Sequence, residues 1–317
     1  MKIGKLENSV LEELILKKFT PMRAESKTQP RIGEDCAVLD IGDDFVALSS
    51  DPITSVGTES LGRLSVYVNC NDAVCSGADP VGLMVTLLVP PSATENDIDR
   101  IANDLAAAAR RCNVDILGGH TEITDAVTRP ITSTTVIARA ARNKALMGAQ
   151  SGDSIIMTKS AGLEGTGIIA AALVEPSMRE ICEYCFDNLS VVQEARIAVD
   201  CGAHALHDVT EGGILGAVWE LATCANLGAT IDVNAIEVLP QTQQLCDRLG
   251  LDPLRLIGSG SLLIACANPE AMLKRLQKAD IPARKIGVLH EGDICDLDGK
   301  PIAPPESDEL YKLNLGK

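Results

Sequence analysis

The amino-acid sequence predicts an α+β fold built from two domains. The chain has 317 residues, which at roughly 100–200 residues per domain is enough for two. Apolar residues make up 46% of the chain but aromatic residues only 2%, so the core must consist of Leu, Ile, Val and Ala, as in sheets covered by helices. Strand and helix patterns alternate irregularly, and neither a P-loop nor a Gly-x-Gly-x-x-Gly fingerprint is present. We place the domains at residues 1–148 and 149–317.

The first half is expected to begin with a helix near residues 9–19, because Ser9 and Glu12 have capping-box spacing ahead of an apolar-periodic stretch. Thr94 and Asp97 open a second clear helix, whose apolar residues line one face. The other elements expected in this half are a helix at 60–76, which stops at Gly77, and strands at 36–41, 45–50, 81–89, 114–117 and 131–140.

The second half is expected to begin with a strand at 154–158, followed by a glycine-rich segment at 162–167. Gly212 and Gly213 precede a further helix, and Asn268-Pro269 caps another, with proline at the favoured first position. The helices expected here are 168–174, two within 178–200, 214–226 and 269–279, and the later strands are 229–233, 261–265 and 284–289.

The net charge of −16 restricts the partners that the chain can bind. Nucleic acids and anionic membranes are bound largely through Lys and Arg, so we expect neither as a partner. An anionic small molecule such as a nucleotide would need a divalent cation, which clustered carboxylates hold. The alternative is that the negative charge only keeps the protein in solution.

Eleven cysteines are spread along the chain, and their odd number argues against a complete disulfide framework. No signal peptide is recognisable, and no apolar stretch approaches the roughly 18 residues of a membrane span. We therefore expect reduced thiols and a cytoplasmic protein. Cys182 and Cys185 have redox or zinc spacing but lie in an expected helix without a second pair, which favours packing. His204 and His290 are interpreted as structural.

Two carboxylates are expected next to short strands of the first half. Asp35 lies in a turn just before a strand, where it would either coordinate a metal or face solvent. Asp51 follows an apolar strand that Pro52 is expected to end, and a carboxylate at the end of a core strand is well placed to face a site.

Polar residues interrupt the otherwise apolar helix expected at 60–76. Asn69, Asn71 and Asp72 are costly in the middle of a helix, both in propensity and in burial. Such local departures tend to mark functional sites, whereas the alternative is a strip that faces solvent. We favour a functional role for Asn71 and Asp72.

Two glycine-containing segments complete the candidate site. In the first, Gly118, Gly119, His120 and Thr121 follow a buried strand, where glycines allow close backbone approach and free N–H groups hold phosphate. The second, residues 207–213 (His-Asp-Val-Thr-Glu-Gly-Gly), stands at a helix start, whose N–H groups attract anions. The alternatives are a plain turn for the first segment and helix capping for the second.

These five segments, in this order, resemble the aminoimidazole-ribonucleotide-synthase-related (PurM-like) superfamily. The resemblance runs from residues 33–38 (Gly-Glu-Asp-Cys-Ala-Val) through 71–80 (Asn-Asp-Ala-Val-Cys-Ser-Gly-Ala-Asp-Pro) and 118–121 to 207–213. It is strongest with the hydrogenase expression/formation branch, through Gly-Arg-Leu-Ser-Val at 62–66 ahead of Asn71-Asp72. The superfamily also includes thiamine-monophosphate kinase and selenophosphate synthetase.

The resemblance implies an N-terminal sheet-and-helix domain that forms a homodimer, a larger C-terminal α+β domain, and ATP and Mg²⁺ as cofactors. ATP would lie between paired N-terminal domains, and Mg²⁺ would offset phosphate charge during transfer. By this match Asp35, Asp51 and Asp72 hold the metal and the other first-half residues approach the nucleotide. The residues assigned to the nucleotide are Asp51, Asn71, Gly118, Gly119, His120 and Thr121; those assigned to catalysis are Asp72, Asp208 and Glu211.

The sequence departs from the hydrogenase-maturation enzymes at three places. Their tail ends in a cysteine that carries the group being dehydrated, whereas the last cysteine here is Cys295. Glu122 stands where they have a lysine, and Glu164 where they have a histidine. We therefore do not expect carbamoyl dehydration on a C-terminal thiol, nor selenophosphate synthesis, because the reactive N-terminal cysteine loop of that enzyme is absent.

Two functions remain open from the sequence. In the first, the chain is an ATP·Mg²⁺-dependent enzyme that phosphorylates or activates an oxygen of a small substrate. In the second, it is a catalytically weak nucleotide-binding accessory protein that works with a protein partner in metallocentre or cofactor assembly. A redox or zinc protein built on the cysteines is a more remote third reading.

Overall fold

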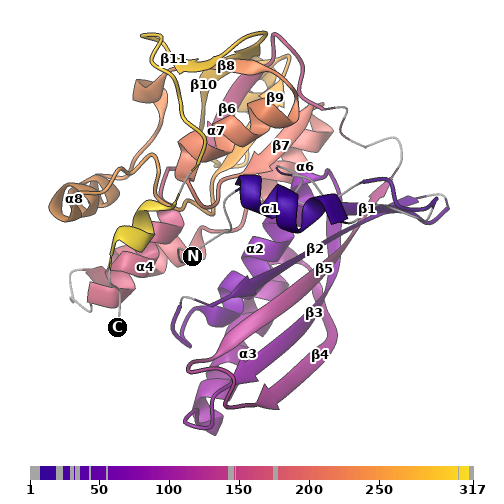
Figure 1. Ribbon diagram of the computed structural model, residues 1–317, viewed down its shortest axis with the longest axis vertical. Coiled ribbons are helices and arrows are strands. Elements are labelled where there is room, and N and C mark those ends of the chain that lie inside the picture. Colours follow the sequence, from indigo (N-terminus) through magenta and orange to yellow (C-terminus); the bar gives the residue numbers. More distant parts are fainter. Residues whose placement is uncertain are drawn as a thin grey trace. The chain divides into compact units, whose positions relative to one another are not determined.

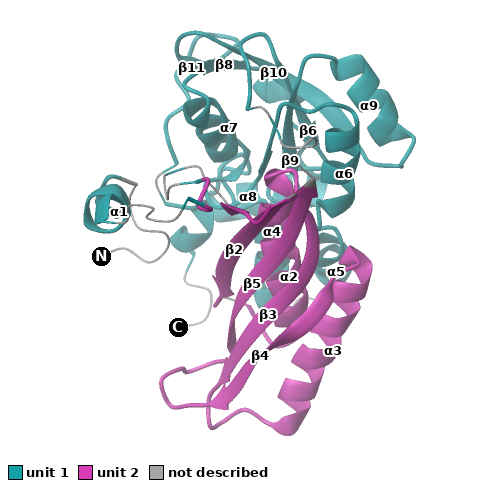
Figure 2. Cartoon of the chain, turned by 90° about the vertical axis from the view of Figure 1, so that its right-hand side faces the viewer, with its two compact units in different colours: residues 1–24, 28–34, 146–317 teal, residues 25–27, 35–145 magenta. Residues whose placement is uncertain are grey.

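The computed structural model describes residues 8–18, 24–28, 32, 36–42, 44–54, 56–141, 146, 148–173, 178–305 and 307–313. The chain divides into two compact units (Figure 2), unit 1 from residues 1–24, 28–34 and 146–317 and unit 2 from residues 25–27 and 35–145. Each unit contains one mixed sheet with helices. The α+β prediction is therefore confirmed, while the boundary at residues 148 and 149 stays a prediction.

Unit 2 is a five-stranded sheet with helices packed against it. Its strands lie in the order β1-β2-β5-β3-β4, antiparallel except for the parallel pair β3 and β4. Helix α2 packs on the sheet and α3 packs beside α2 (Figure 1). The elements are β1 Ala37–Asp40, β2 Asp44–Ile53, α2 Leu61–Cys75, β3 Asp79–Val89, α3 Glu95–Cys112, β4 Asp115–Ile123 and β5 Ile131–Ala141.

Local sequence accounts for the ends of the unit 2 helices. Helix α3 begins with the expected capping box, in which the Thr94 side chain accepts from the Asp97 N–H and the Asp97 carboxylate accepts from the Thr94 N–H. It ends at Asn113, which has a left-handed backbone. Helix α2 ends just before Gly77, whose φ of 79° terminates the helical path, as the sequence predicts.

Unit 1 contains a six-stranded sheet in the order β11-β8-β10-β6-β9-β7. Its strands are β6 Ser154–Thr158, β7 Ala205–Asp208, β8 Gly228–Ile231, β9 Leu262–Cys266, β10 Ala283–His290 and β11 Ile294–Asp296. Its α-helices among the described residues are α1 Asn8–Leu14, α4 Leu163–Leu173, α5 Arg179–Asp187, α6 Val192–Asp200, α7 Gly213–Cys224, α8 Pro240–Leu249 and α9 Pro269–Gln277.

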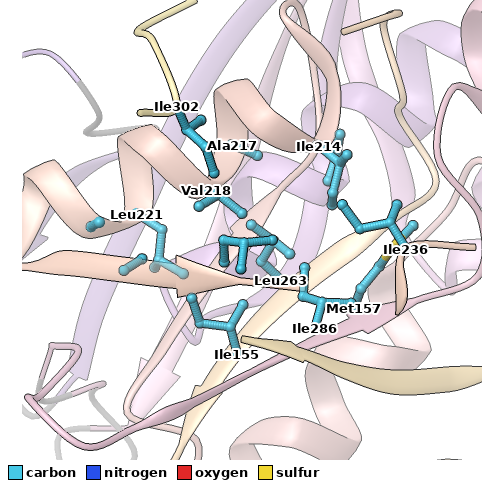
Figure 3. Close-up of a cluster of buried hydrophobic side chains, with 14 of the residues drawn as sticks. Ile155, Met157, Ile214, Ala217, Val218, Leu221, Ile236, Leu263, Ile286 and Ile302 are labelled. Atoms are coloured by element: carbon cyan, nitrogen blue, oxygen red, sulfur yellow. The ribbon is translucent and has the colours of Figure 1, made fainter. Parts of the chain in front are cut away.

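The core of unit 1 is formed between α7 and the sheet. One face of α7, with Ile214, Val218 and Leu221, packs on strand residues that include Ile155 and Leu263 (Figure 3). These side chains are at most 5% exposed. Their burial removes apolar area from water and holds the first turn of α7 against the sheet.

Three local expectations are wrong in ways that bear on the site. Strand β2 does not end at Pro52. Asp51, Pro52 and Ile53 all pair with residues of β5, so the strand continues to Ile53. Gly118 and Gly119 lie inside β4 rather than after it. Helix α4 begins at Leu163, so Glu164 is in its first turn rather than in a glycine-rich loop.

Two further features concern the thiols and the membrane. All eleven cysteines lie within the described residues and none forms a disulfide, and the pair at 182 and 185 lies on α5, as expected. Burial raises the pKa of the Cys185 thiol to about 12, so this sulfur is a packing group rather than a reactive thiolate. In the described part of the chain no helix combines the length and apolarity that a membrane crossing requires.

Candidate functional sites in the two units

Asp72 is held between α2 and β2 in unit 2. The Ser49 hydroxyl donates to Asp72 Oδ2 at 2.7 Å, and the Cys36 thiol donates to the Asp72 carbonyl at 3.2 Å. The side chain is buried, with 8% of its surface exposed. The hydroxyl donor orients the carboxylate, whose oxygens are of the type that hard cations bind. Asp35, the third residue assigned to the metal, lies outside the described residues.

Asp51 occupies the same face of β2, two residues beyond Ser49. Its N–H donates to Asn69 Oδ1 at 3.0 Å, so Asn69 of α2 joins the helix to the backbone of the strand. Asp51 pairs directly with Thr134 of β5, which places the two side chains on one face of the sheet. Among the described residues the Thr134 hydroxyl is buried without a hydrogen-bond partner, which is a cost that a bound polar ligand would remove.

Asn71 is fully buried on α2 but does not share the face of Asp72. Successive residues of a helix are rotated by about 100°, so Asn69 and Asp72 share the side that faces β2 whereas Asn71 points elsewhere. The polar run at 69–72 therefore has two sides. Asn69 has a structural role, because it accepts from the Asp51 N–H. Asp72 is the candidate ligand of the run, because its side chain is a carboxylate oriented by Ser49.

The segment from Gly118 to Thr121 lies in β4, an edge strand whose residues are all exposed. Gly119 has φ of 145°, and a Cβ there would lie 1.8 Å from the Val85 carbonyl oxygen. Strand pairing thus requires glycine at position 119. His120 Nε2 lies 3.5 Å from Glu122 Oε2 on the exposed surface, so the glutamate that replaces a lysine has a local partner when the histidine is protonated.

In unit 1, Asp208 and Glu211 flank the turn between β7 and α7. Asp208 ends β7 and is buried, with 2% exposed. The N-cap of α7 is Gly212, with φ of 87°, and its N–H donates to the Asp308 carboxylate. The Tyr311 hydroxyl donates to Glu211 Oε1 at 2.6 Å.

Glu164 and Asp308 extend this pair into a carboxyl cluster, defined as Glu164, Asp208, Glu211 and Asp308. Burial raises the pKa of Glu164 to about 7, against a hydrogen bond from Ser259 and with the other three carboxyls adding to the rise. Burial likewise raises the pKa of Asp308 to about 6, opposed by three backbone N–H donors. Glu164 Oε2 is buried without a partner among the described residues.

The carboxyl cluster of unit 1 and the aspartates of unit 2 differ in what they can hold. In the described part of the chain, no group of three or more His, Cys, Asp or Glu side chains is placed to bind a metal ion. In unit 2 the structure describes the carboxylates of Asp51 and Asp72. Two carboxylates are enough for a Mg²⁺ site, because water and phosphate oxygens usually supply its other ligands. In the cluster of unit 1, burial raises the pKa of two carboxyls, which favours their protonated forms.

Sequence reasoning missed several of these groups. Ser49 precedes Asp51 by two positions, and the period of a strand alone places both on one face. Thr134, Asp308 and Tyr311 carried no local signal, because their partners lie far away in the chain. Glu164 was noticed only as a departure from a family pattern, and its burial is a property of the folded unit.

Family models match both halves of the chain. The N-terminal domain of AIR synthase related proteins matches residues 33–140, and the C-terminal domain matches residues 150–300. A putative hydrogenase expression/formation protein of Methanocaldococcus jannaschii is 28% identical over 278 residues, 84% of this chain and 82% of the relative. Carbamoyl dehydratase HypE of Cupriavidus necator is 30% identical over 244 residues, 73% of this chain and 68% of the relative.

Solved structures have the same fold. The HypE–HypF complex gives a TM-score of 0.77 at 20% identity, covering 94% of this chain and 100% of the other. AaThiL complexed with AMPPCP and TMP gives 0.76 at 19%, covering 97% and 99%. HypE in complex with ATP gives 0.75 at 23%, covering 98% and 97%. The expected PurM-like architecture is confirmed, and the chain belongs to the family of AIR synthase related proteins, with relatives among the hydrogenase expression/formation proteins.

Proposed function

We propose that this protein is an ATP·Mg²⁺-dependent enzyme that phosphorylates or activates an oxygen of a small substrate. The proposal rests on a cluster of oxygen-bearing side chains on the face of the unit 2 sheet that packs against α2. Asp51 and Asp72 offer carboxylate oxygens there, and the Thr134 hydroxyl beside Asp51 is buried without a partner among the described residues. This is an oxygen-rich donor set of the kind that Mg²⁺ and phosphate groups take.

Within this proposal Asp51 and Asp72, together with Asp35, hold Mg²⁺ against the phosphates. The ion would supply charge neutralisation as phosphate is transferred. The Ser49 hydroxyl orients the Asp72 carboxylate by donating to Oδ2, and Asn69 holds the backbone of Asp51 at its place on β2. Asn71, His120 and Thr121 are assigned to the nucleotide, together with the backbone at Gly118 and Gly119.

Unit 1 is assigned to the substrate. Asp208 and Glu211 stand at the start of α7, where a positive dipole end offsets part of the negative charge of the carboxyls. Glu164 has a pKa raised to about 7 by burial and neighbouring carboxyls, so it is a group that can hold or release a proton near neutral pH.

Relatives that bind nucleotides support the use of ATP. HypE was solved in complex with ATP, and AaThiL with the analogue AMPPCP and with TMP. The relatives named as carbamoyl dehydratases and the thiamine monophosphate kinases catalyse different reactions, so we assign the ATP-dependent class and leave the acceptor as an oxygen-bearing small molecule.

Calorimetric titration of the full chain with ATP and Mg²⁺ tests the assignment. We expect Asp72→Asn to weaken Mg-ATP binding about tenfold or more, because a charged metal ligand is lost. The fold should persist, since an asparagine oxygen can still accept from Ser49. Asp298→Asn, in an exposed turn of unit 1, is the matched control and should bind as the wild type does. An unchanged affinity in Asp72→Asn would remove the metal assignment.

A catalytically weak accessory protein for metallocentre or cofactor assembly is the second candidate. Glu122 favours it, because this residue replaces the lysine of the hydrogenase-maturation enzymes and lies exposed beside His120. A relative was crystallised with a protein partner, as the HypE–HypF complex. ATP turnover with candidate small molecules separates the two functions: tight Mg-ATP binding without phosphate release would favour the accessory role.

A homodimer through unit 2 is part of the proposal. Edge strand β4 and its neighbour β3 expose large apolar side chains, with Leu117 at 54% and Ile123 at 68% exposed. Exposed edge strands with apolar residues are normally covered, because their unpaired backbone groups and apolar area favour association. We assign a second copy of this chain as the partner that covers them.

A further inference from the structure

The segment 307–313 near the end of the described chain lies across the start of α7. It contains a short 3₁₀ helix, η5 Glu309–Lys312. Ahead of it, Pro305 packs against α7, where a Cβ on Gly212 would lie 2.6 Å from the proline Cβ. A glycine is thus used at the N-cap of α7 to admit this part of the chain.

Three side chains of the segment make polar contacts with the rest of unit 1, and Asp308 also accepts from the Ile257 N–H. The Asp308 carboxylate accepts from the Gly212 N–H at 2.8 Å. The Glu309 carboxylate accepts from the Asp252 N–H at 3.0 Å. Tyr311 supplies the third contact, because its hydroxyl donates to Glu211 Oε1 at 2.6 Å. The segment is thus held by side-chain bonds and by the packing of Leu310, which is 8% exposed. It shares no strand or helix ladder with the rest of unit 1 as far as the structure describes it, so its release would not require another element to unfold.

The docked segment brings the Asp308 carboxyl next to carboxyls that other elements of unit 1 already place there. Glu164 from α4, Asp208 from β7 and Glu211 before α7 face Asp308, and Tyr311 and Ser259 are the hydroxyls beside them. Asp308 and Glu164 are 3% and 7% exposed, so water screens the repulsion poorly. Glu164 Oε2, which lacks a partner in the described structure, leaves the cluster incompletely compensated.

We propose that residues 307–313 form a releasable strap over the carboxyl cluster of unit 1, and that a gain of negative charge in the cluster releases the strap. In the docked state the Tyr311 hydroxyl is bonded to Glu211, and the Asp308 carboxylate accepts from the N–H of Gly212 at the N-cap of α7. Release uncovers both of these groups. The strap is a property of unit 1 alone and stands or falls independently of the ATP assignment.

Protonation supplies one such change of charge. Burial, with neighbouring carboxyls adding to it, raises the pKa of Asp308 from its ordinary 3.8 to about 6 and that of Glu164 from its ordinary 4.5 to about 7. Release would expose Asp308 to water and remove its charge from Glu164, so both pKa values would fall toward their ordinary range. A carboxyl with a raised pKa binds its proton more tightly in the docked state, so docking is favoured at low pH. Docking weakens as the pH rises from about 4 through about 7 and changes no further above that.

Hydrogen–deuterium exchange of the full chain between pH 5.5 and 8.5 tests the strap. The readout is the protection factor of peptides covering 307–313, which corrects for the pH dependence of intrinsic exchange, with β6 and β9 as core references. We expect strap protection to fall at least tenfold over this range, since one pKa unit corresponds to a tenfold change, while the core references stay constant.

Three variants separate charge from packing. Glu164→Gln and Asp308→Asn keep hydrogen-bonding capacity without the charge, so each should flatten the loss of protection with pH. Tyr311→Phe should lower protection at every pH and leave the slope unchanged, and Asp298→Asn should match the wild type. The proposal would be overturned if protection of 307–313 in the wild type did not change with pH, or if the core references lost protection in parallel. It would also be overturned if protection in Glu164→Gln fell with pH as steeply as in the wild type.

Discussion

At the residue scale, two buried threonines on one face of β5 differ in their hydrogen bonding. Thr132 is 1% exposed, and its hydroxyl lies 2.5 Å from that of Ser65 on α2. Thr134, two residues further on, is fully buried, and its hydroxyl has no partner among the described residues. A buried hydroxyl without a partner costs about 1–3 kcal/mol. Nothing in the packing of unit 2 explains this cost, which is why we connect it with a ligand.

The two threonines form a matched pair for a stability test. Thr134→Val replaces a partnerless hydroxyl by a methyl group of similar shape and should raise the free energy of unfolding by about 1 kcal/mol. Thr132→Val breaks a buried hydrogen bond and should lower it by about 1 kcal/mol. Chemical denaturation of both variants without nucleotide provides the comparison. If Thr134→Val proves the more destabilising of the two, the hydroxyl has a structural role.

At the element scale, the pairing of β3 with β4 explains a glycine that the sequence had suggested for a ligand. Gly119 and Gly118 both have positive φ, 145° and 153°. A Cβ at 119 would overlap the Val85 backbone at 1.8 Å, whereas one at 118 would meet only the Met84 side chain, at 3.7 Å. The sheet therefore requires glycine at position 119, whereas a Cβ at position 118 would make only an ordinary contact with the Met84 side chain.

Alanine substitutions distinguish the two glycines. Gly119→Ala should lower the free energy of unfolding by several kcal/mol, because backbone must move and a residue with a Cβ is strained at this φ. Gly118→Ala should cost only about 1–2 kcal/mol, from backbone strain alone. Thermal and chemical denaturation measure both. Equal losses in the two variants would contradict the role of the Val85 contact.

At the scale of the whole molecule, the exposed apolar residues of β3 and β4 predict self-association. Ile123→Asp places a charge on this surface and should yield a monomer by light scattering at micromolar concentration, where the wild type is expected to be a dimer. Leu297→Asp is the matched control, because Leu297 is 65% exposed in unit 1, and it should remain dimeric. A wild-type monomer would count against the dimer.

The polar run of α2 illustrates how far sequence reasoning reached. The cost of polar residues in an apolar helix singled out residues 69–72, and the structure shows that the three polar side chains there are buried. The sequence could not predict which of them contacts which neighbour. Asn69 binds the backbone of Asp51, which is a structural role, whereas Asp72 is oriented by Ser49. That division depends on which side of α2 faces β2, and helix propensity contains no such information.

The carboxyl cluster illustrates what sequence reasoning could not reach. Asp308 and Gly212 are 96 positions apart, and Tyr311 and Glu211 are 100 apart. Asp308 lies near the end of the described chain, in a segment without a local pattern that predicts burial. Its burial comes only from the path of the folded chain over α7, as does the raised pKa that follows from burial.

The sequence by itself determined the α+β class, the caps at Thr94 and Asn268 and the family, because capping residues, alternation and ordered motifs are local patterns. Asp51, Asp72, Asp208 and Glu211 were chosen on those local grounds. Only the tertiary structure decided which polar groups are left without partners, namely the Thr134 hydroxyl and Glu164 Oε2. Burial and pairing depend on distant segments, so the contact of Tyr311 with Glu211 and the need for glycine at position 119 appear only once the chain has folded.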